Sequence, residues 1–133
     1  MRIFKFGGAS VKDAEGIRNV HSVLQTVGFE DVLLVISAMG KTTNALEIVI
    51  KNYFEKSAAL QSSVQEVKKY HNQILLDLFE DEKNTVFTDV NSLFTELDHF
   101  LSQNKSPNYN FVYDQVVGYG ELISTTIISH YMS

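Results

Sequence analysis

The spacing of hydrophobic residues in the first part of the chain predicts a strand, a helix and a second strand. Residues 2–6 form a short alternating run around Ile3, Phe4 and Phe6, which is typical of a strand. The segment from Asp31 to Ile36 contains a continuous run of valine, leucine and isoleucine, typical of a strand buried on both faces of a parallel sheet. Between them, Gly28 stands where a helix would end, and apolar residues recur at the helical steps of three and four: Val11, Ile17, Val20, Val23, Leu24 and Val27. Together these elements predict a right-handed βαβ unit.

The middle of the chain has helical periodicity only. From Thr43 to about Phe79 no glycine or proline interrupts the pattern, although we expect one break near Ser57. A turn is expected at Asp81 to Asn84, and a second helical stretch runs from Val86 to Leu101. We interpret residues 45–103 as a long antiparallel helical hairpin inserted after the second strand.

The C-terminal part is predicted to be a loop followed by one more helix. Gln103 to Asn110 is polar and contains a proline, and Phe111 to Tyr131 has helical spacing, with Gly118 and Gly120 allowing another backbone to come close. The pattern predicts only two strands, and a buried parallel pair needs neighbours on its flanks. We therefore expect an incomplete α/β fold, and we expect the chain to be the front part of a longer protein.

Composition narrows the class of protein. A chain of 133 residues with 44% hydrophobic content can bury the core of about one domain. The net charge of −5 argues against a nucleic-acid partner, and no run approaches the roughly 18 apolar residues that span a membrane. Since the chain has no signal peptide and no cysteine for disulfides or thiolate metal sites, we expect a soluble, cytoplasmic protein. We predict no metal site and interpret the histidines as structural, because no metal-ligand spacing relates His21, His71, His99 and His130.

The most informative chemistry lies around the end of the first strand. Lys5 stands near the end of that strand, and Gly7, Gly8 and Ser10 follow it. Glycines let backbone N–H groups approach phosphate oxygens, and a helix N-terminus at the same place attracts anions. A lysine in an apolar strand is costly unless an anion compensates it. We therefore predict a phosphate site here, and the alternative is a tight turn that binds no ligand.

A second candidate site, Ser37 to Asn44, follows the second strand. Ligands of parallel sheets gather beyond the carboxyl ends of the strands, so this segment and the first loop should share one edge. Small hydroxyl side chains can donate there to phosphate or carboxylate oxygens, and the alternative is helix capping by Thr42, Thr43 or Asn44. The Gly-Lys-Thr triplet in this segment is not a P-loop, because Val35 occupies the position that needs the first glycine.

A third candidate is the carboxylate of Glu121, which follows Gly118-Tyr119-Gly120 in the last predicted helix. This carboxylate is suited to pair with a substrate ammonium or with Lys5. The alternative is an exposed helix residue without a role, and the residues alone favour that alternative.

Taken in order, these three segments resemble aspartokinases, which are members of the amino acid kinase family. The resemblance rests on Lys-Phe-Gly-Gly-x-Ser-Val at the start, on Ser-Ala-Met-Gly-Lys-Thr-Thr-Asn-x-Leu from Ser37, and on Gly-Glu-Leu-x-Ser-Thr from Gly120. It implies a three-layer α/β/α fold, incomplete here, and transfer of the γ-phosphoryl group of ATP, with Mg²⁺, to the side-chain carboxylate of L-aspartate. That reaction is the first step towards lysine, threonine, methionine and isoleucine.

The resemblance implies a role for each residue of the first loop. Lys5 would neutralise charge on the transferred phosphoryl group, and phosphate contacts would come from Gly7, Gly8 and Ser10. Ala9 departs from the threonine that is common in the family, which removes one hydroxyl contact. Phosphoryl transfer depends on positioning and charge stabilisation, so no nucleophilic side chain is expected.

On the substrate side, Ser37 and Thr43 would contact the carboxylate or the phosphate, and Glu121 would hold the α-ammonium of aspartate. Aspartokinases continue with nucleotide-binding segments and regulatory ACT domains that residues 1–133 lack, so we expect the chain alone to be inactive. We also expect a homo-oligomer, because unpaired strand edges favour self-association. Two other interpretations stay open: another amino acid kinase of the same superfamily, and a non-catalytic helical module that mediates dimerisation.

Overall fold

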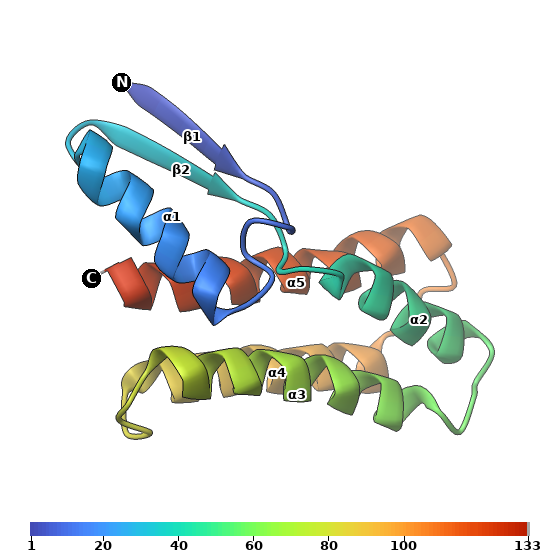
Figure 1. Cartoon of the computed structure of the whole chain (residues 1–133). Coiled ribbons are helices and arrows are strands. Elements are labelled where there is room, and N and C mark those ends of the chain that lie inside the picture. Colours follow the sequence, from blue (N-terminus) through green and yellow to red (C-terminus); the bar gives the residue numbers. More distant parts are fainter. Residues whose placement is uncertain (133) are drawn as a thin grey trace.

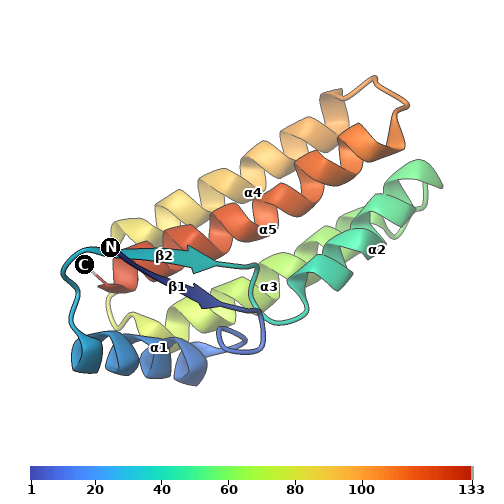
Figure 2. The same cartoon turned by 90° about the horizontal axis from the view of Figure 1, so that it is seen from above.

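The computed structural model of the protein describes residues 1–132 and contains two strands and five helices. In chain order they are β1 (Arg2–Phe6), α1 (Ala14–Val27), β2 (Val32–Ile36), α2 (Thr42–Phe54), α3 (Leu60–Leu78), α4 (Thr85–Gln103) and α5 (Tyr109–Met132). The two strands and α1 lie over one end of a helical bundle, where α5 runs along the sheet and α3 reaches α1, and α2 lies towards the other end (Figures 1 and 2). In the described part of the chain, no helix is long and apolar enough to cross a membrane.

The predicted βαβ unit is confirmed. β1 and β2 pair in parallel, with Arg2 opposite Val32 and Phe6 opposite Ile36, and α1 connects them. The helix ends as predicted at Gly28, where φ is +88° and the N–H donates to the Leu24 carbonyl at 2.8 Å.

The predicted burial of the second strand on both faces is wrong for the described residues. α1 and α5 lie on the same side of the sheet, so its other face stays uncovered (Figure 1). On that open face Ile3, Leu33 and Val35 are 57%, 48% and 45% exposed. A run of apolar residues indicates that a strand tends to be buried, but it does not show which other elements cover its two faces. The α/β fold is therefore present as two layers only, which agrees with an incomplete sandwich.

The helical segments largely match their predictions. The break near Ser57 separates α2 from α3, and the expected turn between α3 and α4 closes with an Asn84 N–H to Asp81 carbonyl bond of 3.0 Å. The sequence does not show how these helices pack: α2 packs mainly on α3 and α5, while α4 packs on α5 (Figure 2). α5 is thus part of the bundle, and the bundle shares one apolar core with α1.

The contact of α5 with α2 depends on one of the two glycines singled out from the sequence. A Cβ atom at Gly120 would lie 3.1 Å from Leu46 Cδ1, 3.2 Å from Ala38 Cβ and 3.3 Å from Thr42 Cγ2. Gly118 has open space around it, so the predicted close approach holds for Gly120 and is wrong for Gly118.

These two glycines form a matched pair for a stability test. We expect G118A to raise the free energy of unfolding by about 0.5–1 kcal/mol, because alanine favours a helix and meets no neighbour. G120A should lower it by about 1–3 kcal/mol, because the added methyl overpacks the contact with Ala38 and Thr42. Urea denaturation of the two variants measures both values, and equal effects would contradict the assigned packing.

Candidate functional site

Two loops meet at the carboxyl ends of the parallel strands. The Gly40 N–H donates to the Gly8 carbonyl at 2.9 Å, and the Ser37 N–H donates to the Phe6 carbonyl at 3.2 Å. The Ser37 hydroxyl also donates to the Phe6 carbonyl, at 3.3 Å. The structure therefore brings the first two candidate segments together at one edge of the sheet.

The contact between the loops requires glycine at two positions. A Cβ at Gly8 would lie 2.7 Å from the Gly40 carbonyl oxygen and 3.0 Å from that of Ala38, and both obstacles are backbone atoms. Gly40 has a φ of +54° and lies against the Tyr70 hydroxyl. Gly7 has open space around it. Gly8 and Gly40 thus serve the close approach, while Gly7 leaves its amide accessible.

The first loop has unused backbone donors. It turns through bonds from the Ser10 N–H to the Gly7 carbonyl at 3.0 Å and from the Val11 N–H to the Gly8 carbonyl at 3.3 Å. Among residues 1–132, no hydrogen bond engages the amides of Gly7, Gly8 or Ala9. Free N–H groups on a loop of small residues can bind an anion.

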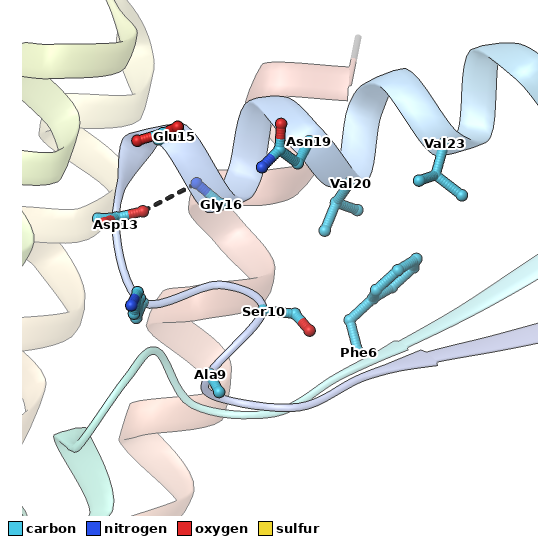
Figure 3. A pocket seen from close by; sticks show the side chains of 10 residues that line it. Phe6, Ala9, Ser10, Asp13, Glu15, Gly16, Asn19, Val20 and Val23 are labelled. Atoms are coloured by element: carbon cyan, nitrogen blue, oxygen red, sulfur yellow. Dashed lines mark hydrogen bonds between the residues drawn. The ribbon is translucent and has the colours of Figure 1, made fainter.

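The predicted helix N-terminus at this loop is wrong. α1 begins only at Ala14, and the Asp13 carboxylate accepts the Gly16 N–H at 2.8 Å (Figure 3). Glu15 adds a second negative charge in the first turn. This N-terminus is therefore capped by the Asp13 carboxylate, and the charges of Asp13 and Glu15 repel a phosphate.

A cavity of about 470 Å³ lies between this loop and α1, with Asp13 and Glu15 on its wall. Figure 3 shows the Ser10 hydroxyl directed into it, on the same side of the sheet as Phe6. Lys5 alternates with Phe6 along β1 and lies on the opposite, exposed face. The structure therefore separates the Ser10 hydroxyl from the Lys5 ammonium.

The open helix N-terminus of the site belongs to α2. Its N-cap residue, Lys41, makes no side-chain capping bond, and the Thr42 hydroxyl donates instead to the Met39 carbonyl at 2.5 Å. Capping by Thr42, Thr43 or Asn44 is therefore not what the structure shows. Within the described residues, no bond engages the amides of Thr43 and Asn44. The positive end of the α2 dipole and free amides such as that of Thr43 are features that can bind an anion.

α5 contacts the second loop through a hydrogen bond and a close packing contact. The Ser124 hydroxyl donates to the Ser37 carbonyl at 2.8 Å, and Gly120 contacts Ala38 and Thr42. Glu121 comes directly after Gly120 and is exposed. Neither Glu121 nor Lys5 has an ion-pair partner in the described part of the chain, so the two do not pair with each other.

Sequence reasoning missed the supports that α3 and α5 give to the loops. Ser124 lies inside the Gly-Glu-Leu-x-Ser-Thr pattern, but nothing in that pattern shows that its hydroxyl bonds Ser37. The Tyr70 hydroxyl donates to the Lys12 carbonyl, and burial together with the Asp13 carboxylate raises the pKa of Tyr70. His71 is fully buried. The sequence indicates this burial only through the position of His71, which falls among the apolar positions of the helical pattern.

The loop contact predicts different effects for the two neighbouring glycines. We expect G8A to lower the free energy of unfolding by about 2–3 kcal/mol, because its methyl would clash with two carbonyl oxygens that cannot rotate away. G7A should change it by less than about 0.5 kcal/mol. Thermal unfolding of both variants checks this, and a tolerated G8A would contradict the described contact.

Comparison with known proteins adds the family context. No protein-family model matches the chain. Chloroplastic aspartokinase 1 of Arabidopsis thaliana is 29% identical over 134 residues, covering 98% of this chain and 23% of that protein. The chloroplastic bifunctional aspartokinase/homoserine dehydrogenase of Daucus carota is 27% identical over 139 residues, covering 96% of this chain and 14% of that protein.

A comparison with solved structures also finds an aspartokinase, and it concerns the fold. Escherichia coli aspartokinase III in complex with aspartate and ADP matches with a TM-score of 0.82 at 20% identity, covering 99% of this chain and 28% of that one. The chain spans less than a third of each of these three proteins. Over nearly its whole length it resembles aspartokinases in sequence, and it has the aspartokinase fold over the part that it spans.

Proposed function

We propose that the chain forms the aspartate-binding and phosphoryl-binding side of an aspartokinase catalytic domain. The reaction transfers the γ-phosphoryl group of ATP to the side-chain carboxylate of L-aspartate and yields 4-phospho-L-aspartate. One observation carries the proposal: two loops with free amides are held together at the carboxyl ends of parallel strands, in a chain similar to aspartokinases. The aspartokinase III structure named above contains aspartate and ADP, which supports this choice of substrates.

The proposed division assigns residues 1–133 to the N-terminal portion of the catalytic domain. Residues 45–103 would be its helical insertion, and the nucleotide-binding half and the ACT domains would lie in other parts of an aspartokinase. The short coverage of each matched protein supports this division. The cytoplasmic location, the homo-oligomeric state and the place in amino-acid biosynthesis stay predictions.

The chemistry needs charge stabilisation more than a reactive side chain. An oxygen of the aspartate carboxylate attacks the γ-phosphorus, the bond from that phosphorus to the bridging oxygen breaks, and ADP leaves with the electron pair. Donors that face the transferred group stabilise its charge in the transition state. The free amides of Gly7 and Gly8 are suited to this task, and the Lys5 ammonium at the end of β1 would add a full positive charge.

Substrate binding would use the N-terminus of α2 and the surface of α5. A carboxylate of aspartate would accept the free amide and the hydroxyl of Thr43, and the carboxylate of Glu121 would accept its α-ammonium. Ser37 would have to exchange its bond to the Phe6 carbonyl for one to a substrate oxygen. Ser10 would contribute through the loop backbone, because its hydroxyl faces the cavity beside α1.

In a complete aspartokinase, Mg²⁺ would accompany the phosphates of ATP. No three carboxylate or imidazole side chains gather among residues 1–132 in a way that could hold a metal ion. We therefore assign no ligand and no step for Mg²⁺ to this chain.

The division of the site predicts the behaviour of the chain alone. We expect purified residues 1–133 to show no aspartate-dependent release of ADP above background, because nucleotide binding would need the remaining part of the domain. A coupled ADP assay with and without L-aspartate measures this, with a complete aspartokinase as the positive control. Robust turnover by the chain would refute the division.

A second prediction tests Lys5 in a longer aspartokinase chain that carries this segment. We expect K5A to lower kcat about 100-fold or more and to change KM for aspartate less than about threefold, because the charge acts mainly on the transition state. Lys51, exposed on α2 away from the loops, gives the control K51A, which should leave both constants unchanged. An unchanged kcat in K5A would remove Lys5 from the mechanism.

A further inference from the structure

A buried imidazole lies against the first turn of α2. His71 on α3 has no exposed surface, and the only other buried polar side chains of the described residues are those of Thr42 and Ser124. The His71 ring makes edge-to-face contacts with two aromatic rings, that of Tyr70 at 5.1 Å and that of Phe94 at 5.9 Å between centroids.

The hydrogen bonds of His71 define its tautomer. Nδ1 lies 2.8 Å from the Val67 carbonyl oxygen, which can only accept, so Nδ1 carries the proton. In the neutral ring Nε2 is then an acceptor, and it lies 3.5 Å from the Thr42 hydroxyl oxygen. That hydroxyl has a single proton and also lies 2.5 Å from the Met39 carbonyl oxygen. His71 and Met39 therefore compete for the Thr42 proton.

The protonation state of His71 follows from its surroundings. Burial lowers the pKa of His71, and the hydrogen bond to Val67 opposes this only in part. The groups that face the ring are the Thr42 hydroxyl from α2, the Tyr70 phenol from α3 and the Phe94 ring from α4. Of these Tyr70 can ionise, but its raised pKa keeps it neutral wherever an imidazole titrates. His71 is therefore neutral at pH 7, with Nε2 available as an acceptor.

We propose that His71 is a positioning residue of the aspartate site, acting through the Thr42 hydroxyl on the turn that presents Thr43. The turn from Met39 to Thr42 closes through the Thr42 N–H to the Met39 carbonyl at 3.0 Å, so the same carbonyl receives both the amide and the hydroxyl of Thr42. Any change in the acceptor at His71 alters this arrangement directly before Thr43. The part of this proposal that concerns aspartate binding rests on the proposed function. The part that concerns the position of the turn does not.

The test compares two substitutions of His71 in the 133-residue chain. Glutamine places its amide near the position of Nε2 and keeps a partner for Thr42, whereas asparagine reaches only the position of Nδ1 and keeps the bond to Val67. We expect H71Q to retain the hydrogen-exchange protection of the bonded amides of Thr42 and Ala45 within about twofold, and H71N to lower it about five- to tenfold. Equal losses in both variants would show a packing role only and overturn the proposal.

A second pair of variants keeps the test decisive if H71N does not fold. T42S retains the hydroxyl and T42V removes it without changing the shape of the side chain. We expect T42V to lower the protection of the amides of position 42 and Ala45 as much as H71N, and T42S to behave like the unmodified chain. Unchanged protection in T42V would overturn the proposal.

The pH profile gives a readout that packing alone would not move. Because the folded pKa of His71 is lower than its unfolded value of about 6.5, the unfolded chain takes up a proton first as the pH falls. The stability contribution of His71 is complete above about pH 6.5 and is lost progressively below it, down to the folded pKa. We expect the free energy of unfolding of H71Q to fall less steeply below about pH 6.5 than that of the unmodified chain. The same pH dependence in both proteins would contradict a buried neutral imidazole.

Calorimetric titration with L-aspartate then tests the ligand side. We expect H71N to bind aspartate about five- to tenfold more weakly than the unmodified chain, with H71Q close to normal. Equal affinity in H71N and the unmodified chain would overturn the proposal. An unmodified chain that binds no aspartate would refute the proposed function, and the exchange experiment would still decide whether His71 positions the turn.

Discussion

The site depends on the contact between two stretches of bare backbone. Gly8 and Gly40 approach each other so closely that the amide of one bonds the carbonyl of the other at 2.9 Å, and a single methyl at Gly8 would prevent it. This contact joins the loops that follow the two strands and holds them at one edge of the sheet. The free amides of the first loop and the open N-terminus of α2 owe their proximity to it.

Two helices of the bundle, α3 and α5, contact these loops and support their shape. α5 contacts the second loop through Gly120 and the Ser124 hydroxyl, and α3 contacts it through His71 and Tyr70. Each of these contacts is made by a small or polar group at an otherwise apolar helix position. The packing of the bundle therefore helps to position the first turn of α2. A change deep in α3 or α5 is thus expected to reach the site through the loop backbone.

Much of the fold could be predicted from local signals in the sequence. Alternation, helical spacing and the glycine at position 28 located every strand and helix, because each of these signals acts within a few residues. The start of α1 was misplaced since Val11 is apolar in a loop, where it is buried by tertiary contacts. The faces of the sheet and the pairing of the helices depend on distant parts of the chain, which periodicity does not report.

The candidate site shows the same limit. Sequence spacing identified both loops, but it assigned the anion to the N-terminus of α1, which Asp13 closes, rather than to that of α2. The residue types at Ser10 and Ser37 were suited to phosphate, yet their hydroxyls turn to a cavity and to the Phe6 carbonyl. Gly118 and Gly120 look alike in sequence, and only the neighbours of Gly120 distinguish them. Side-chain direction is set by tertiary packing, so residue type alone could not decide these points.

The central claim is that the joined loops bind aspartate. Hydrogen exchange of every backbone amide in the unmodified chain, with and without saturating L-aspartate, tests it most directly. The account predicts slower exchange in residues 7–10 and 37–44 and at Glu121, with residues 86–101 unaffected. No change in the two loops, or protection that instead follows protein concentration along residues 86–101, would contradict it and favour a helical dimerisation module.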